Sequence, residues 1–208
     1  MSAEAHATVP QHTLVLASQS PIRRTLLSNA GVEVLAVPAR IDEDSVKSAM
    51  LADAQKPRDI CDALAELKAQ KVSRTYPAHF VLGSDQILVL NGRMFSKPET
   101  EADAYEQLLL LRNNTHELLS AAVIFYGGEP VFRHIGRARL TMRSFSDRFA
   151  KQYIENEGKT VLDTVGGYKI EERGAQLFSR LDGDYFSILG LPLLEVLDYL
   201  RARELLIQ

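Results

Sequence analysis

The chain has 208 residues, of which 46% are hydrophobic and 25% are charged, a balance that excludes disordered and fibrous proteins. Its 24 Lys and Arg residues against 27 Asp and Glu residues leave a net charge of -3, whereas a general binder of nucleic acid polymers usually carries a basic excess. No window approaches the ~20 apolar residues of a membrane span. We therefore expect neither a nucleic acid polymer nor a membrane as partner.

The cysteine content and the first residues bear on compartment and domain organisation. Cys61 is the single cysteine, which excludes an intramolecular disulfide and a multi-cysteine zinc site. Residues 1–12 lack the basic and apolar regions of a signal peptide and are typical of a flexible tail. We expect a cytoplasmic protein in which residues 13–208 form a single domain.

The first half of the chain alternates predicted strands and helices. Apolar runs predict buried strands over residues 13–17, 32–37 and 79–83, the last ending at Ser84-Asp85-Gln86. A hydroxyl cap at Ser20 followed by Pro21 predicts a helix that ends at Gly31. Helical spacing predicts another helix over residues 57–74, and the acidic residues 42–44 lie in a loop or at a helix start.

Hairpins and helices fill the second half. Residues 87–90 and 93–95 flank Asn91-Gly92, a pair that favours a type I′ turn, and residues 118–126 and 131–143 flank a second turn. Helices are predicted over residues 101–111, from a cap at Ser146 to residue 156, and after Pro192, whereas residues 166–185 are glycine-rich and irregular. The pattern predicts an α/β fold with a mixed, partly parallel twisted sheet and flanking helices.

One candidate site follows the first strand, in the stretch SQSPIRR at residues 18–24. A helix N-terminus offers unpaired N–H groups, Ser18 and Ser20 add hydroxyl donors, and Arg23 and Arg24 add forked donors suited to phosphate. The stretch therefore predicts a phosphate cradle without the glycine-rich P-loop pattern. A capped helix with two solvated arginines is the plainer interpretation.

Other candidates depend on their surroundings. Asp85 directly follows an apolar strand, where it could hold a divalent metal, orient a water molecule or merely cap a turn. Lys97, after the first hairpin, and Lys68, on a predicted helix, could reach a phosphate, although most single lysines are solvated. Asp42 and Glu43 are either metal ligands or a solvated loop, and Glu171 follows glycines that let a ligand approach the backbone.

Taken in order, these segments resemble the Maf family of nucleotide pyrophosphatases. The matching segments are LASQSPIRR at residues 16–24, Asp42-Glu43, residues 64–69, Gly83 to Gln86, Lys97-Pro98, residues 167–171 and residues 190–193. They extend over nearly the whole chain. Each is modest alone, but seven in order at family-like spacing are specific.

The resemblance implies a two-lobed fold with a central cleft. It implies hydrolysis of a nucleoside triphosphate to the monophosphate and pyrophosphate with Mg²⁺ or Mn²⁺, in a house-cleaning role, and a homodimer. Asp85 matches the position of the catalytic proton acceptor in the family. Glu43 and Asp85 match the acidic positions on the metal side of the site. The phosphate-binding positions correspond to Ser18, Arg23, Arg24, Lys68 and Lys97.

Three positions in the family relate to base preference, here Ile22, Gln86 and Glu171. Gln86 and Glu171 resemble the 7-methyl-GTP branch, whereas Ile22 matches neither that branch nor the dTTP/UTP branch. A carboxylate at Glu171 can accept both donors of the guanine edge, and Gln86 can donate to a base carbonyl. The alternatives are a dTTP/UTP pyrophosphatase, an inosine-triphosphate pyrophosphatase, which the opening of the chain disfavours, and a nucleotide-binding regulator of septum formation with little turnover.

Overall fold

The computed structural model describes residue 10 and residues 12–207. Almost all of the tail predicted over residues 1–12 lies outside this part of the chain. Seven strands form one sheet: β1 (Leu14–Leu16), β2 (Val34–Ala36), β3 (Val81–Leu90), β4 (Arg93–Phe95), β5 (Thr115–Tyr126), β6 (Glu129–Met142) and β7 (Phe178–Asp182). The α-helices are α1 (Pro21–Asn29), α2 (Glu43–Ala52), α3 (Pro57–Ser73), α4 (Glu101–Leu111), α5 (Asp147–Glu157), α6 (Tyr185–Ile188) and α7 (Leu193–Ala202). Three 3₁₀ helices, η1 (Gly158–Asp163), η2 (Val165–Gly167) and η3 (Arg173–Leu177), lie between α5 and β7.

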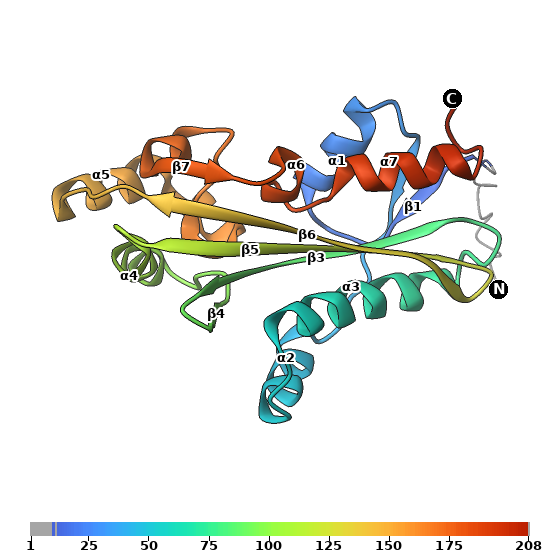
Figure 1. Cartoon of the computed structure of the whole chain (residues 1–208), viewed down its shortest axis with the longest axis horizontal. Helices are drawn as coiled ribbons and strands as arrows, with labels where there is room; N and C mark the ends of the chain where they lie inside the picture. Colours follow the sequence, from blue (N-terminus) through green and yellow to red (C-terminus); the bar gives the residue numbers. More distant parts are fainter. Residues whose placement is uncertain (1–9, 11, 208) are drawn as a thin grey trace, which may run out of the picture.

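The sheet is mixed, as predicted. Its strand order is β2-β1-β3-β5-β6-β7, with β4 paired to β3. β1 pairs in parallel with both β2 and β3, and all other pairings are antiparallel. The long strands β3, β5 and β6 run through the whole molecule (Figure 1).

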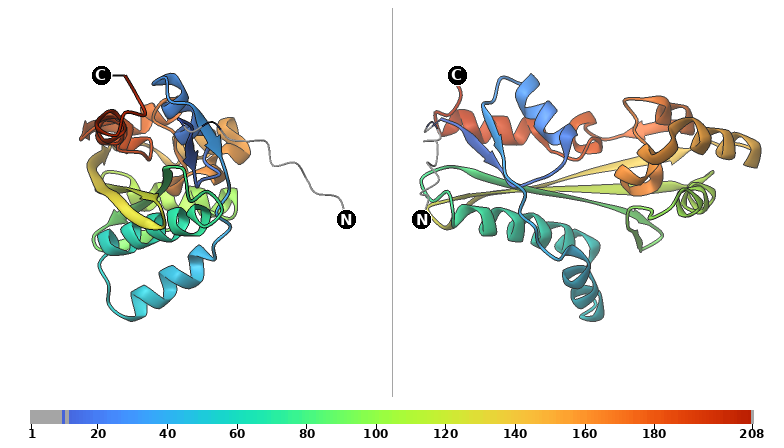
Figure 2. Two further views of the ribbon diagram at one scale, coloured as in Figure 1. Left: turned by 90° about the vertical axis from the view of Figure 1, so that its right-hand side faces the viewer. Right: turned by 180° about the vertical axis from the view of Figure 1, so that it is seen from behind.

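Helices cover the two faces of the sheet at one end of these long strands. α3 packs on one face against β3 and β5, with α2 beyond it, while α1 and α7 lie on the other face (Figures 1 and 2). Side chains alternate along a strand, so Leu82 joins the core under α1 and α7, while Val81 joins the core under α3. At the other end of the strands, α4, α5 and the 3₁₀ helices enclose a third core. These two ends are the two lobes that the family resemblance implied.

The central strand β3 changes partners along one edge. β1 pairs with Val81 and Leu82, and β4 pairs with residues 88–90. Between them, in the strand pairings of the described chain, residues 83–87 have a partner on one side only, the strand β5. We call residues 83–87 the open edge of β3. Because a strand edge exposes backbone N–H and C=O groups, this segment between the lobes is available for other contacts.

Three local predictions were wrong. Residues 79–90 do not contain two strands separated at Ser84-Asp85-Gln86, because the antiparallel partner β5 continues the strand through these polar residues. Ser20 is at the N-cap position of α1, but its side chain makes no capping hydrogen bond. The glycine-rich region includes β7, which pairs with β6. The Asn91-Gly92 turn is confirmed, since both residues have the positive φ that a type I′ turn needs.

Candidate functional site

The close approach of α3 to β3 brings Lys68 onto Asp85. A Cβ at Gly83 would lie 2.1 Å from the Ala65 carbonyl oxygen and 2.6 Å from the Ala69 backbone nitrogen, so only glycine permits this packing. Asp85 lies two residues further along β3 and therefore on the same face of the sheet. Lys68 Nζ donates to Asp85 Oδ1 at 2.6 Å, and both side chains are less than a tenth exposed.

A second carboxylate completes this ion pair. Lys68 Nζ also lies 2.9 Å from Oε1 of Glu43, the first residue of α2, where Asp42 accepts a hydrogen bond from the Ser45 backbone N–H. Partial burial raises the pKa of Glu43, but the charge and hydrogen bond of Lys68, together with the charges of Lys47 and Arg23, outweigh it, so its pKa is lowered overall. The residues at 42–44 are therefore a helix start, and Glu43 is an ionised member of the site.

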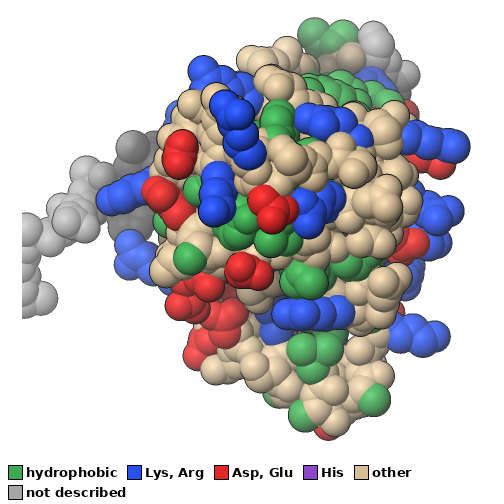
Figure 3. Space-filling model, turned by 90° about the vertical axis from the view of Figure 1, so that its left-hand side faces the viewer, with side chains coloured by type: hydrophobic (Ala, Val, Ile, Leu, Met, Phe, Trp, Pro, Cys, Tyr) green, Lys and Arg blue, Asp and Glu red, His purple; other side chains and the backbone are tan. Residues whose placement is uncertain are grey.

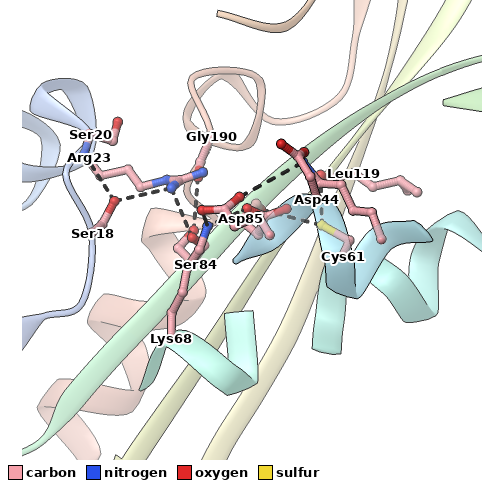
Figure 4. Close-up of polar contacts among 12 residues, drawn as sticks. Ser18, Ser20, Arg23, Asp44, Cys61, Lys68, Ser84, Asp85, Leu119 and Gly190 are labelled. Carbon is pink, nitrogen blue, oxygen red and sulfur yellow. Dashed lines mark hydrogen bonds and ion pairs between the residues drawn. The ribbon is translucent and has the colours of Figure 1, made fainter. Parts of the chain in front are cut away.

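Arg23 reaches the open edge of β3 from α1. Val15 N–H donates to the Phe80 carbonyl and Ala17 N–H to the Leu82 carbonyl, and at the next carbonyl in this series, Ser84, the Arg23 guanidinium replaces the strand. Arg23 Nη1 donates to the Ser84 oxygen at 2.9 Å and to Ser18 Oγ at 3.3 Å, and Nε donates to the Gly190 oxygen at 2.8 Å (Figure 4). These contacts fix the guanidinium beside Asp85.

The charge of Arg23 belongs to the same cluster. Burial lowers the pKa of its guanidinium, and the nearby negative charge of Asp85 counteracts part of that shift. A guanidinium remains charged because its ordinary pKa is so high. The hydrogen bonds of the described chain use Nε and Nη1 and leave Nη2 for a ligand.

One carboxylate oxygen of Asp85 has no hydrogen-bond partner in the described chain. Oδ1 accepts from Lys68, whereas Oδ2 is buried and has no hydrogen-bond partner within the described part of the chain. A buried acceptor without a partner is costly and indicates a missing ligand or water. No group of three His, Cys, Asp or Glu side chains there could hold a metal, but Mg²⁺ needs only one or two carboxylates when substrate phosphates complete its shell. Asp85 and Glu43 therefore fit a divalent cation that binds together with a phosphate substrate.

Cys61 lies behind Asp85 on α3. Its Sγ–H points at the carbonyl oxygens of Leu119, at 3.2 Å, and Asp85, at 3.5 Å (Figure 4). Burial, reinforced by the charge of Asp85, raises the pKa of the thiol, so Cys61 stays protonated and supports the strand rather than serving as a nucleophile.

The two remaining predicted cations differ in position. Lys97 is at the surface just after β4, yet partial burial lowers the pKa of its ammonium and the positive charge of Arg23 lowers it further, which indicates that Lys97 is close to the cluster. Arg24 is exposed on α1, one residue and so about 100° around the helix from Arg23. No contact in the described chain joins Arg24 to the cluster.

No contact in the described chain joins the three predicted base-preference residues to one another. Ile22 packs half-buried against the core under α1 and α7. Glu171 is exposed in a turn, where its charge contributes to raising the pKa of Tyr153, and no contact in the described chain links it to Asp85. Gln86 lies on the opposite face of β3 from Asp85, and its amide nitrogen already donates to three protein oxygens. Donation from Gln86 to a base carbonyl would need these bonds to be exchanged, and it stays a prediction.

Several residues of the site escaped the sequence reasoning. Ser84, Gly190, Ser120 and Ser187 support Arg23 and Gln86. The family-like stretches contained Ser84 and Gly190, but these residues hold Arg23 through their backbone carbonyl oxygens. Because every residue has such an oxygen, the residue type gives no signal of this role. Ser120 had no signal, because its function depends on the β3–β5 register that places it opposite Gln86.

Comparison with known proteins places this geometry in context. A family model described as Maf-like protein matches residues 13–203. The chain is 53% identical over 190 residues to a protein of Roseobacter denitrificans named nucleoside triphosphate pyrophosphatase, covering 91% of this chain and 96% of the relative. A protein of the same name from Caulobacter vibrioides is 48% identical, covering 90% of this chain and 94% of the relative. A Rhizobium etli protein named 7-methyl-GTP pyrophosphatase is 43% identical with the same coverages.

Proposed function

Because the chain belongs to the family of Maf-like proteins, we propose that it is an enzyme that hydrolyses a nucleoside triphosphate to the monophosphate and pyrophosphate. The names of the relatives from Roseobacter denitrificans and Caulobacter vibrioides support this reaction. The observation that carries the proposal is Asp85, a buried carboxylate with one free oxygen beside two buried cations.

The cations around Asp85 suit a triphosphate. Arg23 Nη2 and the Lys97 ammonium are donors that could bind phosphate oxygens, and Lys68 adds a third positive charge. The N-terminus of α1, next to Ser18 and Ser20, contributes backbone N–H groups and the positive end of the helix dipole. Cations held in place before the reaction stabilise the charge that develops when water attacks the α-phosphorus.

A divalent metal fits the carboxylates of the site. We propose that Asp85 and Glu43 hold Mg²⁺ or Mn²⁺ together with the substrate. When bound, such an ion supplies Lewis-acid stabilisation of phosphate oxygens and lowers the pKa of a coordinated water. Lys68 contacts both carboxylates and so holds them in position in the absence of other ligands.

The role proposed for Asp85 follows from its free oxygen. Oδ2 can accept a hydrogen bond from the attacking water and orient it, and can take its proton as the oxygen bonds to the α-phosphorus. The bond from the α-phosphorus to the oxygen that bridges to the β-phosphate then breaks, and pyrophosphate leaves. Lys68, which is bonded to Oδ1, restricts the rotation of the carboxylate and so holds Oδ2 towards the substrate side.

For the base, we propose 7-methyl-GTP or GTP over dTTP and UTP. The support is the name of the Rhizobium etli relative and the carboxylate at Glu171, which matches the two adjacent donors of guanine and the positive charge of its methylated ring. Glu171 is exposed and free of contacts with the cluster in the described chain, so reading the base requires the nucleotide to span from Asp85 to the turn that carries Glu171.

One experiment tests both parts of the proposal. The purified chain is incubated with 7-methyl-GTP, GTP, dTTP and UTP in Mg²⁺ or Mn²⁺, and the inorganic product is identified as pyrophosphate or orthophosphate. We expect pyrophosphate, no turnover in chelator, and a higher kcat/KM for the two guanine nucleotides. Orthophosphate as the only inorganic product contradicts the reaction, a preference for dTTP and UTP contradicts the base assignment, and tight binding without turnover favours a regulator.

A further inference from the structure

The Gln86 side chain is held by an unusual set of neighbours. Its Nε2 lies 3.0 Å from Ser120 Oγ, 3.2 Å from the Ser187 carbonyl oxygen and 3.0 Å from the Ile188 carbonyl oxygen. The two carbonyls belong to the last residues of α6, where helix carbonyls have no partner within the helix. The Ser187 carbonyl also accepts from the Gly190 N–H and the Ser120 hydroxyl, whereas Gln86 is the donor that the hydrogen bonds of the described chain give to the Ile188 carbonyl.

All three neighbours act as hydrogen-bond acceptors. The two carbonyl oxygens cannot donate, and the Ser120 hydroxyl donates its own proton to the Ser187 carbonyl at 2.7 Å, which leaves a lone pair for Gln86. Ser120 and Ser187 are buried, so water does not readily replace these bonds. Rotating the amide by 180° would turn Gln86 Oε1 towards two carbonyl oxygens that can only accept. The network therefore fixes the amide with nitrogen towards α6 and oxygen away from it.

The oxygen of this amide borders the same space as Arg23. A Cβ at Gly190 would lie 3.5 Å from Arg23 Nη2 and 3.7 Å from Gln86 Oε1, so both atoms face the place where Gly190 has no side chain. Gly190 has a φ of +101°, a conformation that other residues rarely adopt. Gln86 is also only partly buried, and the hydrogen bonds of the described chain leave Oε1 without a donor.

We propose that Gln86 is an acceptor-only specificity residue, and that the substrate group it recognises is an N–H or O–H donor of the nucleotide. The inference rests on the proposed function and extends it, because it states that the nucleotide group next to the open edge of β3 is a hydrogen-bond donor. The donor is an exocyclic amine of the base or a hydroxyl of the ribose. A carbonyl at that place would meet the lone pairs of Oε1 and be rejected.

Pairs of nucleotides that differ in one donor test the proposal. GTP and ITP differ by the 2-amine of the base, ATP and ITP by an amine against a carbonyl at position 6, and GTP is compared with its 2′-deoxy and 3′-deoxy forms for the hydroxyls. In the wild type we expect one of these donors to raise kcat/KM about tenfold or more. Which pair responds distinguishes the base from the ribose.

Gln86→Leu links that preference to this side chain. In Gln86→Leu and Gln86→Met we expect the kcat/KM ratio of the responding nucleotide pair to fall towards one. Damage to the fold would instead lower kcat/KM for all nucleotides alike. The matched control Gln152→Leu changes an exposed glutamine on α5 and should keep the wild-type ratios. A wild type indifferent to every donor, or variants that keep the ratio, would overturn the inference.

Binding of the corresponding monophosphates, measured by calorimetry, separates this inference from the proposed reaction. If no triphosphate is hydrolysed but a donor strengthens monophosphate binding through Gln86, the reaction is wrong and the inference stands. If pyrophosphate is released and no donor matters, the reaction stands and the inference is wrong. Absence of nucleotide binding overturns both.

Discussion

At the scale of single residues, the site is organised around Lys68. A lysine this buried needs a partner, and Lys68 has two, Asp85 and Glu43. Because the ammonium donates to only one oxygen of Asp85, the pair does not consume the whole carboxylate. The same arrangement makes the site tolerant of losing one negative charge, since Lys68 keeps its other partner.

This tolerance allows Asp85 to be tested without unfolding the protein. Asp85→Asn keeps the size of the side chain but removes its charge and basicity, so we expect kcat for the proposed hydrolysis to fall by at least ~10²-fold. The melting temperature should change little, because Glu43 still pairs with Lys68.

Asp44→Asn is the matched control, because this carboxylate is next to Glu43 but its side chain is 90% exposed. Its kcat should equal that of the wild type. A folded Asp85→Asn enzyme with wild-type kcat would show that Asp85 has only a structural role.

At the scale of secondary structure elements, the distance between α3 and β3 determines the geometry of the site. Gly83 sets that distance, because a Cβ there would meet the backbone of α3 and not the flexible end of a side chain. α3 carries both Lys68 and Cys61, so a shift of this helix moves both contacts with Asp85 at once. Helix packing and the geometry of the candidate site are therefore coupled.

Gly83→Ala tests this coupling. The added methyl group must push α3 away from β3, so we expect a loss of about 1–3 kcal/mol of stability, as for other overpacked cores, together with a loss of kcat. Urea unfolding and steady-state kinetics measure the two effects.

Gly127→Ala is the comparison, since Gly127 has a φ of +61° and nothing within 4 Å of an added Cβ. Backbone strain there should cost about 1–2 kcal/mol while kcat stays at the wild-type level. Equal kcat values for Gly83→Ala and wild type would mean that the spacing of α3 does not control the chemistry.

At the scale of the whole molecule, the lobe that contains α4 and α5 combines a charged surface with a buried histidine. The end that contains α4 and α5 presents basic and acidic side chains interspersed over its surface (Figure 3). Inside this lobe, the fully buried His116 forms a 2.6 Å hydrogen bond through Nε2 with Tyr168, while its Nδ1 has no partner in the described chain. No helix within the described residues is long and apolar enough to cross a bilayer.

Burial of His116 makes the stability of the protein depend on pH. Burial lowers the pKa of His116 from 6.5 to about 4, so between these values the unfolded chain binds a proton that the folded chain does not. Stability is complete above about pH 6.5 and is lost as the pH falls towards about 4, with a loss on the order of 2 kcal/mol at pH 5. Unfolding free energies at pH 7.5 and pH 5 measure it.

Two variants separate His116 from other groups that titrate. In His116→Gln the difference in stability between pH 7.5 and pH 5 should shrink by that amount. In Tyr168→Phe the stability should fall at both pH values, but the difference between them should persist, because burial and not the tyrosine lowers the pKa of His116. An unchanged pH dependence in His116→Gln would mean that His116 is not the responsible group.

The sequence by itself determined the elements whose signals are local. The hydroxyl, proline and glycine signals placed α1 and α5 within a few residues, and helical spacing placed α3. The backbone conformation that Asn91-Gly92 favours predicted its turn. The order of short motifs identified the family. It also pointed to Arg23, Lys68 and Asp85, which the fold brings together with Glu43.

Only the tertiary structure decided how these residues act. Pairing with β5 carried β3 through polar residues that locally resemble a strand end, so Asp85 lies in the middle of a strand. Packing separated Arg23, buried on backbone carbonyls, from Arg24, which is exposed, although the two are identical in type and adjacent in sequence. The carbonyls of α6 engage the amide nitrogen of Gln86, the group expected to donate to a base. Contacts between residues distant in the chain, and backbone groups that every residue shares, leave no mark in the local pattern of residue types.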